Sequence, residues 1–387
     1  MHAAAALGVD TYWVDATWFK NGFPNGVGNY EFTPGFPEEM INVSNEAHKN
    51  NMKFMMWFEV ERVHQGSDTF ALYENEPEKL LSDGNESPDD REAGLPEDWK
   101  KSTNRLLNLG NDDTREWLTN IIIGFIDRNK IDVYRQDFNF DPLVYWQHAD
   151  VTDRKGITEN KYIIGFYKYW DSLLQRFPKL LIDNCNSGGR RIDIETCKRS
   201  VPAWRSDTAC RPPKDDYPVS EWHQNQTIGV SRYIPYHSVS SWYETAYHFR
   251  SGATMGISCV FDVLNDDYDM ETGKAAVAEM ALMKPHWKGD FYPLTEQSNE
   301  KTVWSGYQLV NENAGFCLLF RRENNEDTEK TFCINGIKED KNYSLTFHDE
   351  NRKITEKTFS GSTLSKGLPV TIPQKPGSLL ITYKEKK

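Results

Sequence analysis

Long apolar runs alternate with amphipathic segments over most of the chain. The run MKFMMWFEVE (52–61) is almost continuously apolar, as is typical of a parallel strand that is covered on both faces. Apolar residues at a spacing of three to four predict amphipathic helices over 114–130 and 162–177. Strand, loop and helix follow one another repeatedly in this order, which indicates a parallel α/β architecture.

The predicted strands share a feature at their carboxyl ends, where the apolar run gives way to polar or charged residues. These ends carry Asp15, Glu59, Asp137, Cys185, Asp207 and Asp262. In a (β/α)8 barrel the carboxyl ends of all strands form one face, which holds the active site. One acid at a strand end is unremarkable, but several acids on one face indicate a site. We therefore predict an α/β fold with a TIM (β/α)8-type barrel.

The pattern changes near residue 288. Later segments such as NYSLTFHD (342–349) alternate apolar and polar positions and are separated by Asn, Gly and Asp turn residues. This pattern predicts antiparallel strands that form a small β-sandwich. We expect residues 1–287 to form a catalytic barrel and residues 288–387 to form a C-terminal β-sandwich domain.

Composition and charge narrow the classes of partner. The formal net charge of −13 argues against nucleic acid and anionic membranes as partners, and no apolar run reaches the length of a membrane span. The six cysteines contain no CxxC pair, so we expect neither a metal site nor a disulfide framework. No cofactor is expected for the chemistry proposed below. The opening MHAAAALGVD lacks the basic region and apolar core of a signal peptide. This fits a cytoplasmic protein, which is the default, or a chain whose true beginning is missing.

The stretch IDVYRQDFNFD (131–141) is the centre of the predicted site. Asp137 ends a run of β-branched and aromatic residues, where a carboxylate is costly unless hydrogen bonds or a nearby charge stabilise it. Side chains along a strand have a period of two, so Arg135 and Asp137 face the same side. The guanidinium would lower the pKa of Asp137. A structural ion pair at the strand end is the alternative.

Asp207 has similar surroundings in the sequence, because an apolar run and Arg205 precede it. Glycoside hydrolysis needs two carboxyl groups that flank the bond to be cleaved, one of which donates a proton. Asp137 and Asp207 are the natural pair for this chemistry. The alternative interpretation of each residue is a structural salt bridge. Their similar contexts leave open which of the two is the nucleophile and which is the acid.

Three further positions at strand ends offer ligand contacts. The segment CNSGGRR (185–191) follows a strand, and its glycines would let backbone N–H groups approach a ligand closely, with a tight turn as the alternative. Trp57 is either a flat platform for a sugar ring or a core tryptophan. Asp15 either binds sugar hydroxyls or caps the loop that follows it.

A series of segments in the barrel part carries a resemblance to a known family. In chain order they are WVDATWF (13–19), WFEVERV (57–63), YRQDFNFDPLVYW (134–146), IDNCNSGGRRID (182–193) and RSVPAWRSD (199–207). Together they resemble glycoside hydrolase family 36, the α-galactosidases and their relatives. The resemblance covers essentially the whole chain, and the order of the motifs makes it highly specific.

The resemblance implies a role for each residue of the predicted site. Asp137, flanked by Arg135 and Asn139, occupies the position of the family's nucleophile, and Asp207 occupies that of the general acid/base. The predicted substrate-binding residues are Asp15, Trp57, Arg135, Asn139, Cys185, Gly188 and Arg205.

The implied activity is that of a retaining α-galactosidase, which acts by double displacement on terminal α-linked galactosyl residues of an oligosaccharide or polysaccharide. Asp137 attacks the anomeric carbon while Asp207 protonates the leaving oxygen, and the two carboxyl groups are expected about 5–5.5 Å apart. The alternatives are an α-N-acetylgalactosaminidase, a transglycosylase of the same family and a non-catalytic carbohydrate-binding fragment. A homo-oligomer is left open.

Several departures from the family pattern bear on the sugar and on the extent of the chain. Ala16 follows Asp15 where typical members carry a second acid, and Val60 stands in place of a proline. Arg135 stands in place of the usual lysine and presents its donors in a different geometry. The changes at Ala16 and Arg135 alter the expected hydroxyl contacts, so galactose is the default and N-acetylgalactosamine or a modified galactose is left open. Family members also begin with a large β-sandwich and a first barrel strand, so we expect a truncated chain that lacks both.

Overall fold

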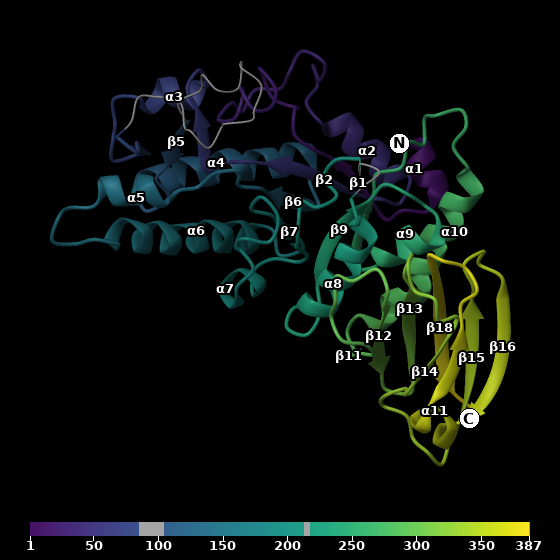
Figure 1. The fold of residues 1–387 in the computed structure, drawn as a ribbon. Helices are drawn as coiled ribbons and strands as arrows, with labels where there is room; N and C mark the ends of the chain where they lie inside the picture. The colour runs from purple at the N-terminus through teal and green to yellow at the C-terminus, as the bar shows by residue number, and fades with distance from the viewer. Residues whose placement is uncertain (85–103, 213–216, 387) are drawn as a thin grey trace. The chain divides into compact units, whose positions relative to one another are not determined.

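The computed structural model describes residues 1–84, 104–212 and 217–386, and the chain divides into two compact units (Figure 1). Unit 1 contains Met1 and Val9–Trp204, and unit 2 contains His2–Gly8 and Arg205–Lys387. The domain boundary that we predict near residue 288 falls inside unit 2. The division into residues 1–287 and 288–387 therefore stays a prediction.

A parallel sheet forms the centre of unit 1. Its strands are β1 (Thr11–Val14), β2 (Lys53–Phe58), β6 (Val133–Gln136), β7 (Leu181–Asn184) and β8 (Ala203–Trp204), which follow one another in this order across the sheet. Every residue of β6 is buried, and so is every residue of β2 after Lys53, as the continuous apolar run predicts. The register places Arg135 between Trp57 on one neighbouring strand and Asp183 on the other. The predicted parallel α/β architecture is confirmed.

Helices of unit 1 connect these strands. They are α2 (Ile41–Lys49), α4 (Asp112–Asn129), α5 (Leu143–Ala149), α6 (Ile157–Arg176) and α7 (Ile194–Cys197). Helix α4 begins where the Asn111 side chain accepts a hydrogen bond from Thr114 N–H, and it ends at Lys130, whose φ is +49°. It packs against α6, and these two helices confirm the predicted amphipathic segments.

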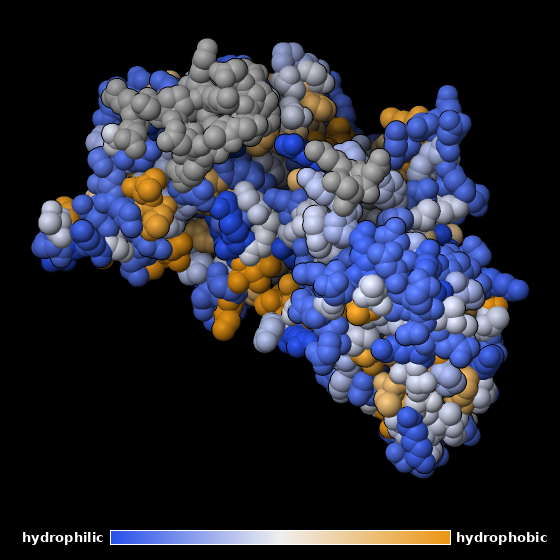
Figure 2. All heavy atoms as spheres, viewed as in Figure 1, coloured by the Kyte–Doolittle hydropathy of each residue, from blue (hydrophilic) through white to orange (hydrophobic). Residues whose placement is uncertain are grey.

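Figure 2 shows a mostly hydrophilic face with scattered apolar patches. Leu143 of α5 and Ile164 of α6 are among the exposed apolar side chains of unit 1. No helix in the described part of the chain combines the length and the apolar character that a membrane span requires.

A small sheet interrupts the alternation between β2 and α4. It consists of β3 (Arg62–His64), β5 (Asn104–Leu107) and β4 (Leu80–Leu81) in this order, with α3 (Asp68–Tyr73) beside β3. The sequence suggests only a polar surface excursion over 65–104. Residues 85–103 of that stretch lie outside the described residues.

Unit 2 combines a parallel pair of strands with helices. β9 (His237–Ser241) pairs with β10 (Gly256–Cys259), and the helices are α8 (Val219–Val230), α9 (Ala246–Ser251) and α10 (Met270–Met283). The first helix of the chain, α1 (His2–Leu7), packs on α10, where the Leu7 side chain lies over Gly273. This contact assigns α1 to unit 2 although unit 1 follows it in the sequence.

The antiparallel part of unit 2 shares its core with the helices. A six-stranded sheet has the order β11 (Asp290–Pro293), β12 (Trp304–Asn311), β13 (Ala314–Arg321), β18 (Gly377–Glu385), β15 (Asn342–His348) and β16 (Ile354–Ser360). Two further strands, β14 (Glu329–Phe332) and β17 (Leu368–Thr371), pair with each other. Helix α11 (Gly361–Lys366) precedes β17. On one face of this sheet Cys317 packs in a core with Val370 of β17. On the other face Phe316 packs in a core with Ile228 of α8, which explains why the compact unit includes the residues before 288.

Candidate active site

Asp137 lies directly after β6 and is only 8% exposed. Its Oδ1 accepts hydrogen bonds from Phe138 N–H at 2.7 Å and from Ser187 N–H at 3.2 Å. Its Oδ2 accepts from Asn139 Nδ2 at 2.9 Å and from Trp57 Nε1 at 3.2 Å. The four donors surround a carboxylate that is built to carry a negative charge without bulk water.

The pKa of Asp137 reflects two opposing effects. Burial raises it, whereas the nearby Arg135 charge and hydrogen bonds from Cys185, Asn139 and Phe138 lower it, and the net pKa lies below the usual aspartate value. The carboxyl group is therefore ionised at neutral pH. An ionised carboxylate suits a nucleophile, whereas a general acid needs a raised pKa.

The turn after β7 supplies one of these donors through its backbone. Ser187 has a φ of +42° and Gly188 a φ of +86°, and Asn186 N–H closes the turn on Gly188 O at 2.9 Å. This left-handed geometry favours glycine and directs Ser187 N–H toward Asp137. Cys185 at the start of the turn is buried and donates to the same carboxylate. The turn is thus tight and also contacts the candidate nucleophile.

Arg135 is held between two aromatic rings. Its guanidinium carbon lies 4.4 Å from the ring centroids of both Trp13 and Trp204, and Nη1 forms an ion pair with Asp183. Stacking on indole faces and a buried carboxylate fix the cation in place. Its charge reaches Asp137 from this position. Asp183 is not among the site residues predicted from the sequence, although Asp183 and Cys185 have the two-residue spacing of one strand face.

Asn139 links Asp137 to a second buried acid. Its backbone N–H donates to Glu59 Oε1 at 2.8 Å, and its Oδ1 accepts from Ser187 Oγ at 2.9 Å. Arg62 binds both carboxylate oxygens of Glu59 at 2.8 Å, which fixes Glu59. Asn139 is therefore oriented on both sides of its amide, and its Nδ2 is aimed at Asp137. Glu59 therefore holds Asn139 in place. The sequence indicated Glu59 only as an acid at the end of a strand.

Trp57 is a core tryptophan that also contacts Asp137, and its predicted role as a platform for a sugar ring stays a prediction. The ring is buried and lies nearly parallel to Phe19, with centroids 6.2 Å apart. Its Nε1 donates to Asp137, so a core tryptophan is also a member of the site. Asp15 follows β1 and is exposed, and its Oδ1 accepts from Ala16 N–H at 2.6 Å.

The two remaining predicted residues, Asp207 and Arg205, belong to unit 2. Asp207 is half-buried in the turn after β8. Arg205 is buried and donates to Thr227 Oγ1 at 2.6 Å and to the His223 carbonyl at 3.1 Å, and burial lowers its pKa to about 9. These contacts favour a structural role for Arg205, and its predicted sugar contact stays a prediction. The carboxyl separation between Asp137 and Asp207 also stays a prediction, because the two acids lie in different units.

A bound metal ion needs several ligating side chains close together. Within residues 1–84, 104–212 and 217–386, no group of three or more His, Cys, Asp or Glu side chains is arranged to hold a metal ion.

Comparisons with known proteins give consistent findings. The sequence model of the Melibiase family matches residues 1–212. Alpha-galactosidase Mel36A of Lactobacillus acidophilus is 24% identical over 207 residues, which are 53% of this chain and 26% of that protein. An alpha-galactosidase of Escherichia coli is 29% identical over 210 residues, which are 53% of this chain and 27% of that protein. The chain thus spans about a quarter of the length of these curated relatives.

Solved structures resemble the fold over nearly the whole chain. The alpha-galactosidase from Lactobacillus brevis has a TM-score of 0.79 at 18% identity and covers 100% of this chain and 52% of that one. The GH36 alpha-galactosidase AgaA from Geobacillus stearothermophilus has a TM-score of 0.78 at 16% identity and covers 99% of this chain and 52% of that one. At this identity the likeness establishes the fold.

Proposed function

Because this chain belongs to the Melibiase family, we propose that it carries the catalytic centre of a retaining α-galactosidase that acts on terminal α-linked galactosyl residues. The observation that carries the proposal is the buried, ionised and fully oriented carboxylate of Asp137. The relatives named alpha-galactosidase and the structures of AgaA variants in complex with raffinose and with stachyose support the substrate class.

In the proposed mechanism, Asp137 attacks the anomeric carbon and forms a covalent glycosyl-enzyme. Asp207 protonates the leaving oxygen and then, as a base, activates the water that hydrolyses the intermediate. The lowered pKa of Asp137 supports the nucleophile assignment, because this carboxyl must be ionised when the substrate binds. The same donors stabilise the carboxylate again when it leaves in the second step.

The identity of the sugar is the finer part of the proposal. Arg135 is committed to Asp183 and to two indole rings, so it offers a sugar hydroxyl different donors from those of a lysine. Ala16 likewise removes one acid beside Asp15. α-N-Acetylgalactosamine is therefore included as a test substrate, and a sugar acceptor in the assay detects transfer in place of hydrolysis.

A panel of nitrophenyl α-glycosides tests the proposal. The chain should release nitrophenol from the α-galactoside or the α-N-acetylgalactosaminide, with the α-anomer as the first product, and Asp137→Ala should abolish release. Azide should rescue Asp137→Ala with formation of the β-glycosyl azide, because azide then replaces the nucleophile from the opposite face. First release of the β-anomer, or full activity in Asp137→Ala, would overturn the proposal. Sugar binding without turnover would favour the non-catalytic alternative.

A further inference from the structure

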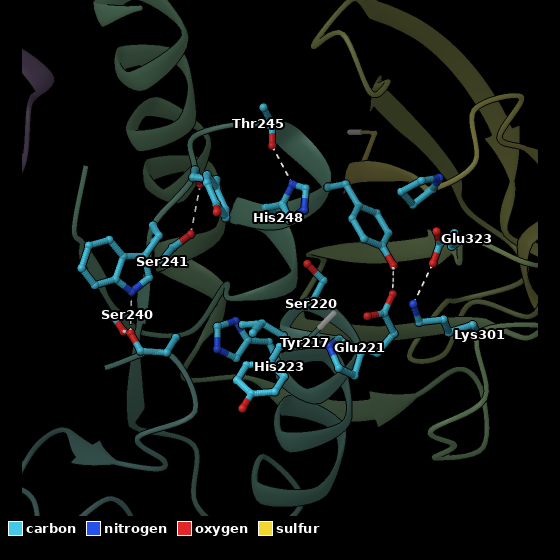
Figure 3. A pocket seen from close by; sticks show the side chains of 17 residues that line it. Tyr217, Ser220, Glu221, His223, Ser240, Ser241, Thr245, His248, Lys301 and Glu323 are labelled. Atoms are coloured by element: carbon cyan, nitrogen blue, oxygen red, sulfur yellow. Dashed lines mark hydrogen bonds and ion pairs between the residues drawn. The ribbon is translucent and has the colours of Figure 1, made fainter. Parts of the chain in front are cut away.

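A cavity apart from the Asp137 site lies entirely within unit 2 (Figure 3). Its volume of about 450 Å³ is in the usual range for small-molecule pockets, roughly 300–1,000 Å³. The side chains that line it include Ala209, Tyr217, Glu221, His223, Trp242 and Tyr243. We propose that this cavity binds a sugar unit of a neutral oligosaccharide on the leaving-group side of the cleaved bond. The inference rests on the proposed function.

The cavity adjoins the turn that carries Asp207. The carbonyl of Ala209, two residues after Asp207, accepts hydrogen bonds from Trp242 Nε1 at 2.7 Å and from Ser240 Oγ. The end of β9 is thus fastened to this turn, and Ala209, Ser240 and Trp242 line the cavity. A general acid donates its proton to the glycosidic oxygen, so the leaving sugars must lie beside the acid. The cavity borders the turn of that acid within unit 2, which is why we assign it to the leaving sugars.

The rim of the cavity presents aromatic rings to solvent. Tyr217 and Tyr243 are 49% and 44% exposed, so their rings are accessible to a ligand. The Tyr243 ring lies 5.3 Å from the His248 ring, which holds it in place. Sugar rings have apolar faces formed by C–H groups, and these faces pack on exposed aromatic rings.

The floor of the cavity offers polar groups that match sugar hydroxyls. Glu221 is buried, and its Oε1 accepts from Tyr247 Oη at 2.8 Å, which orients the carboxylate (Figure 3). His223 is 3% exposed, and its Nε2 has no hydrogen-bond partner within the described part of the chain. A buried polar atom without a partner is costly, and a ligand hydroxyl would satisfy it.

The charges around the cavity favour a neutral ligand. Lys301 and Glu323 neutralise each other at 2.8 Å. Burial and the nearby Arg205 lower the pKa of His223 to about 3, so the imidazole is neutral at the pH of the assay. A saccharide, which has hydroxyl groups and no charge, fits this combination of rings, one oriented carboxylate and a neutral imidazole.

The test compares a long and a short substrate in matched variants. Tyr243→Ala and Tyr217→Ala should each raise the ratio of the KM for stachyose to the KM for α-galactosyl fluoride about tenfold, because each removes one stacking surface and the fluoride leaving group is too small to reach the rings. Tyr243→Phe keeps the ring and should restore the wild-type ratio. Tyr233→Ala is the matched control, since Tyr233 is 81% exposed in the same unit but does not line the cavity. An unchanged ratio in both alanine variants would overturn the inference.

A separate readout distinguishes this inference from the proposed function. If the wild-type chain hydrolyses no nitrophenyl glycoside, the proposed function fails, and calorimetric titration with stachyose then tests the cavity alone. Binding that is weakened in Tyr243→Ala and retained in Tyr233→Ala supports the cavity as a saccharide site. Equal binding in both variants, or no binding to the wild-type chain, overturns it.

Discussion

The charge of Asp137 depends on individual neighbours rather than on its strand. Burial alone would favour the protonated form, and the charge of Arg135 together with hydrogen bonds from Cys185, Asn139 and Phe138 reverses the sign of the pKa shift. A lowered pKa in the folded state stabilises the fold at pH values above the unfolded pKa. That contribution is lost as the pH falls through the folded pKa of Asp137.

The pH profile of Asn139→Ala tests this account. In the wild-type chain, the acid limb of kcat/KM that reports Asp137 should lie below about pH 4, the usual aspartate range. Loss of the Asn139 donor should move that limb to higher pH and lower kcat about 10- to 100-fold, because a hydrogen bond to a charged group is lost. Asn351→Ala, on an exposed turn, is the control. An acid limb that does not move in Asn139→Ala would contradict the account.

Asp183→Asn tests the ion pair that holds Arg135. Both partners are buried, so the variant leaves the guanidinium without its buried carboxylate. We expect the free energy of unfolding to fall by about 3–5 kcal/mol, measured by urea titration. Asp141→Asn removes the exposed partner of Arg190 and should cost about 1 kcal/mol at most. Equal losses in the two variants would show that the buried pair has no special role.

At the scale of elements, the turn from Cys185 to Gly189 connects backbone geometry to chemistry. Its two left-handed residues, Ser187 and Gly188, bring a peptide N–H from the end of β7 to a carboxylate at the end of β6. The donor belongs to the backbone, so its position depends on the conformation of the whole turn.

Gly188→Ala should therefore lower kcat as well as stability. Gly156 has the same φ of +86° and open space around an added Cβ, which makes Gly156→Ala a matched control for backbone strain. Each variant should cost about 1–2 kcal/mol of unfolding free energy. Only Gly188→Ala should reduce kcat for the nitrophenyl substrate, since it displaces Ser187 N–H from Asp137. Equal kcat values in Gly188→Ala and Gly156→Ala would show that the turn does not contribute to catalysis.

The sequence predicted the kinds of element better than their contacts. Apolar periodicity located β2, α4 and α6, and the polar residues at strand ends located Asp137, Cys185 and Asp207. Periodicity reports which face of a segment is buried, but it does not report which neighbour covers that face.

The supporting contacts of the site show why the rest was missed. The pairing of Arg135 with Asp183 depends on the register of two strands, and that of Glu59 with Arg62 on the path of the chain after β2. Ser187 contributes through its N–H, which no side-chain pattern encodes. Such contacts follow from the tertiary structure.

At the scale of the whole chain, the shared core of unit 2 governs how the molecule can be divided. Ile228, Met283 and Trp287 lie before residue 288 and belong to one core with Phe316 and Leu380. Separation at residue 288 would expose both halves of this core to water.

A fragment of residues 1–287 tests this division. We expect it to bind a hydrophobic dye and to unfold at a lower urea concentration than the full chain, because the helices of unit 2 lose the sheet face that covers them. The full chain under the same conditions is the control. A fragment that matches the full chain in stability and dye binding would favour the boundary predicted from the sequence.

The contact between α1 and α10 has a consequence for biosynthesis. The ribosome makes α1 before any strand of unit 1, whereas its partner α10 emerges only after all of them. Unit 1 can begin to fold while the nascent chain is still growing. The apolar side of α1, in contrast, is covered only after the whole of unit 1 and then α10 have been synthesised. During translation, Leu7 and its neighbours are therefore a segment that chaperones can bind until α10 has emerged.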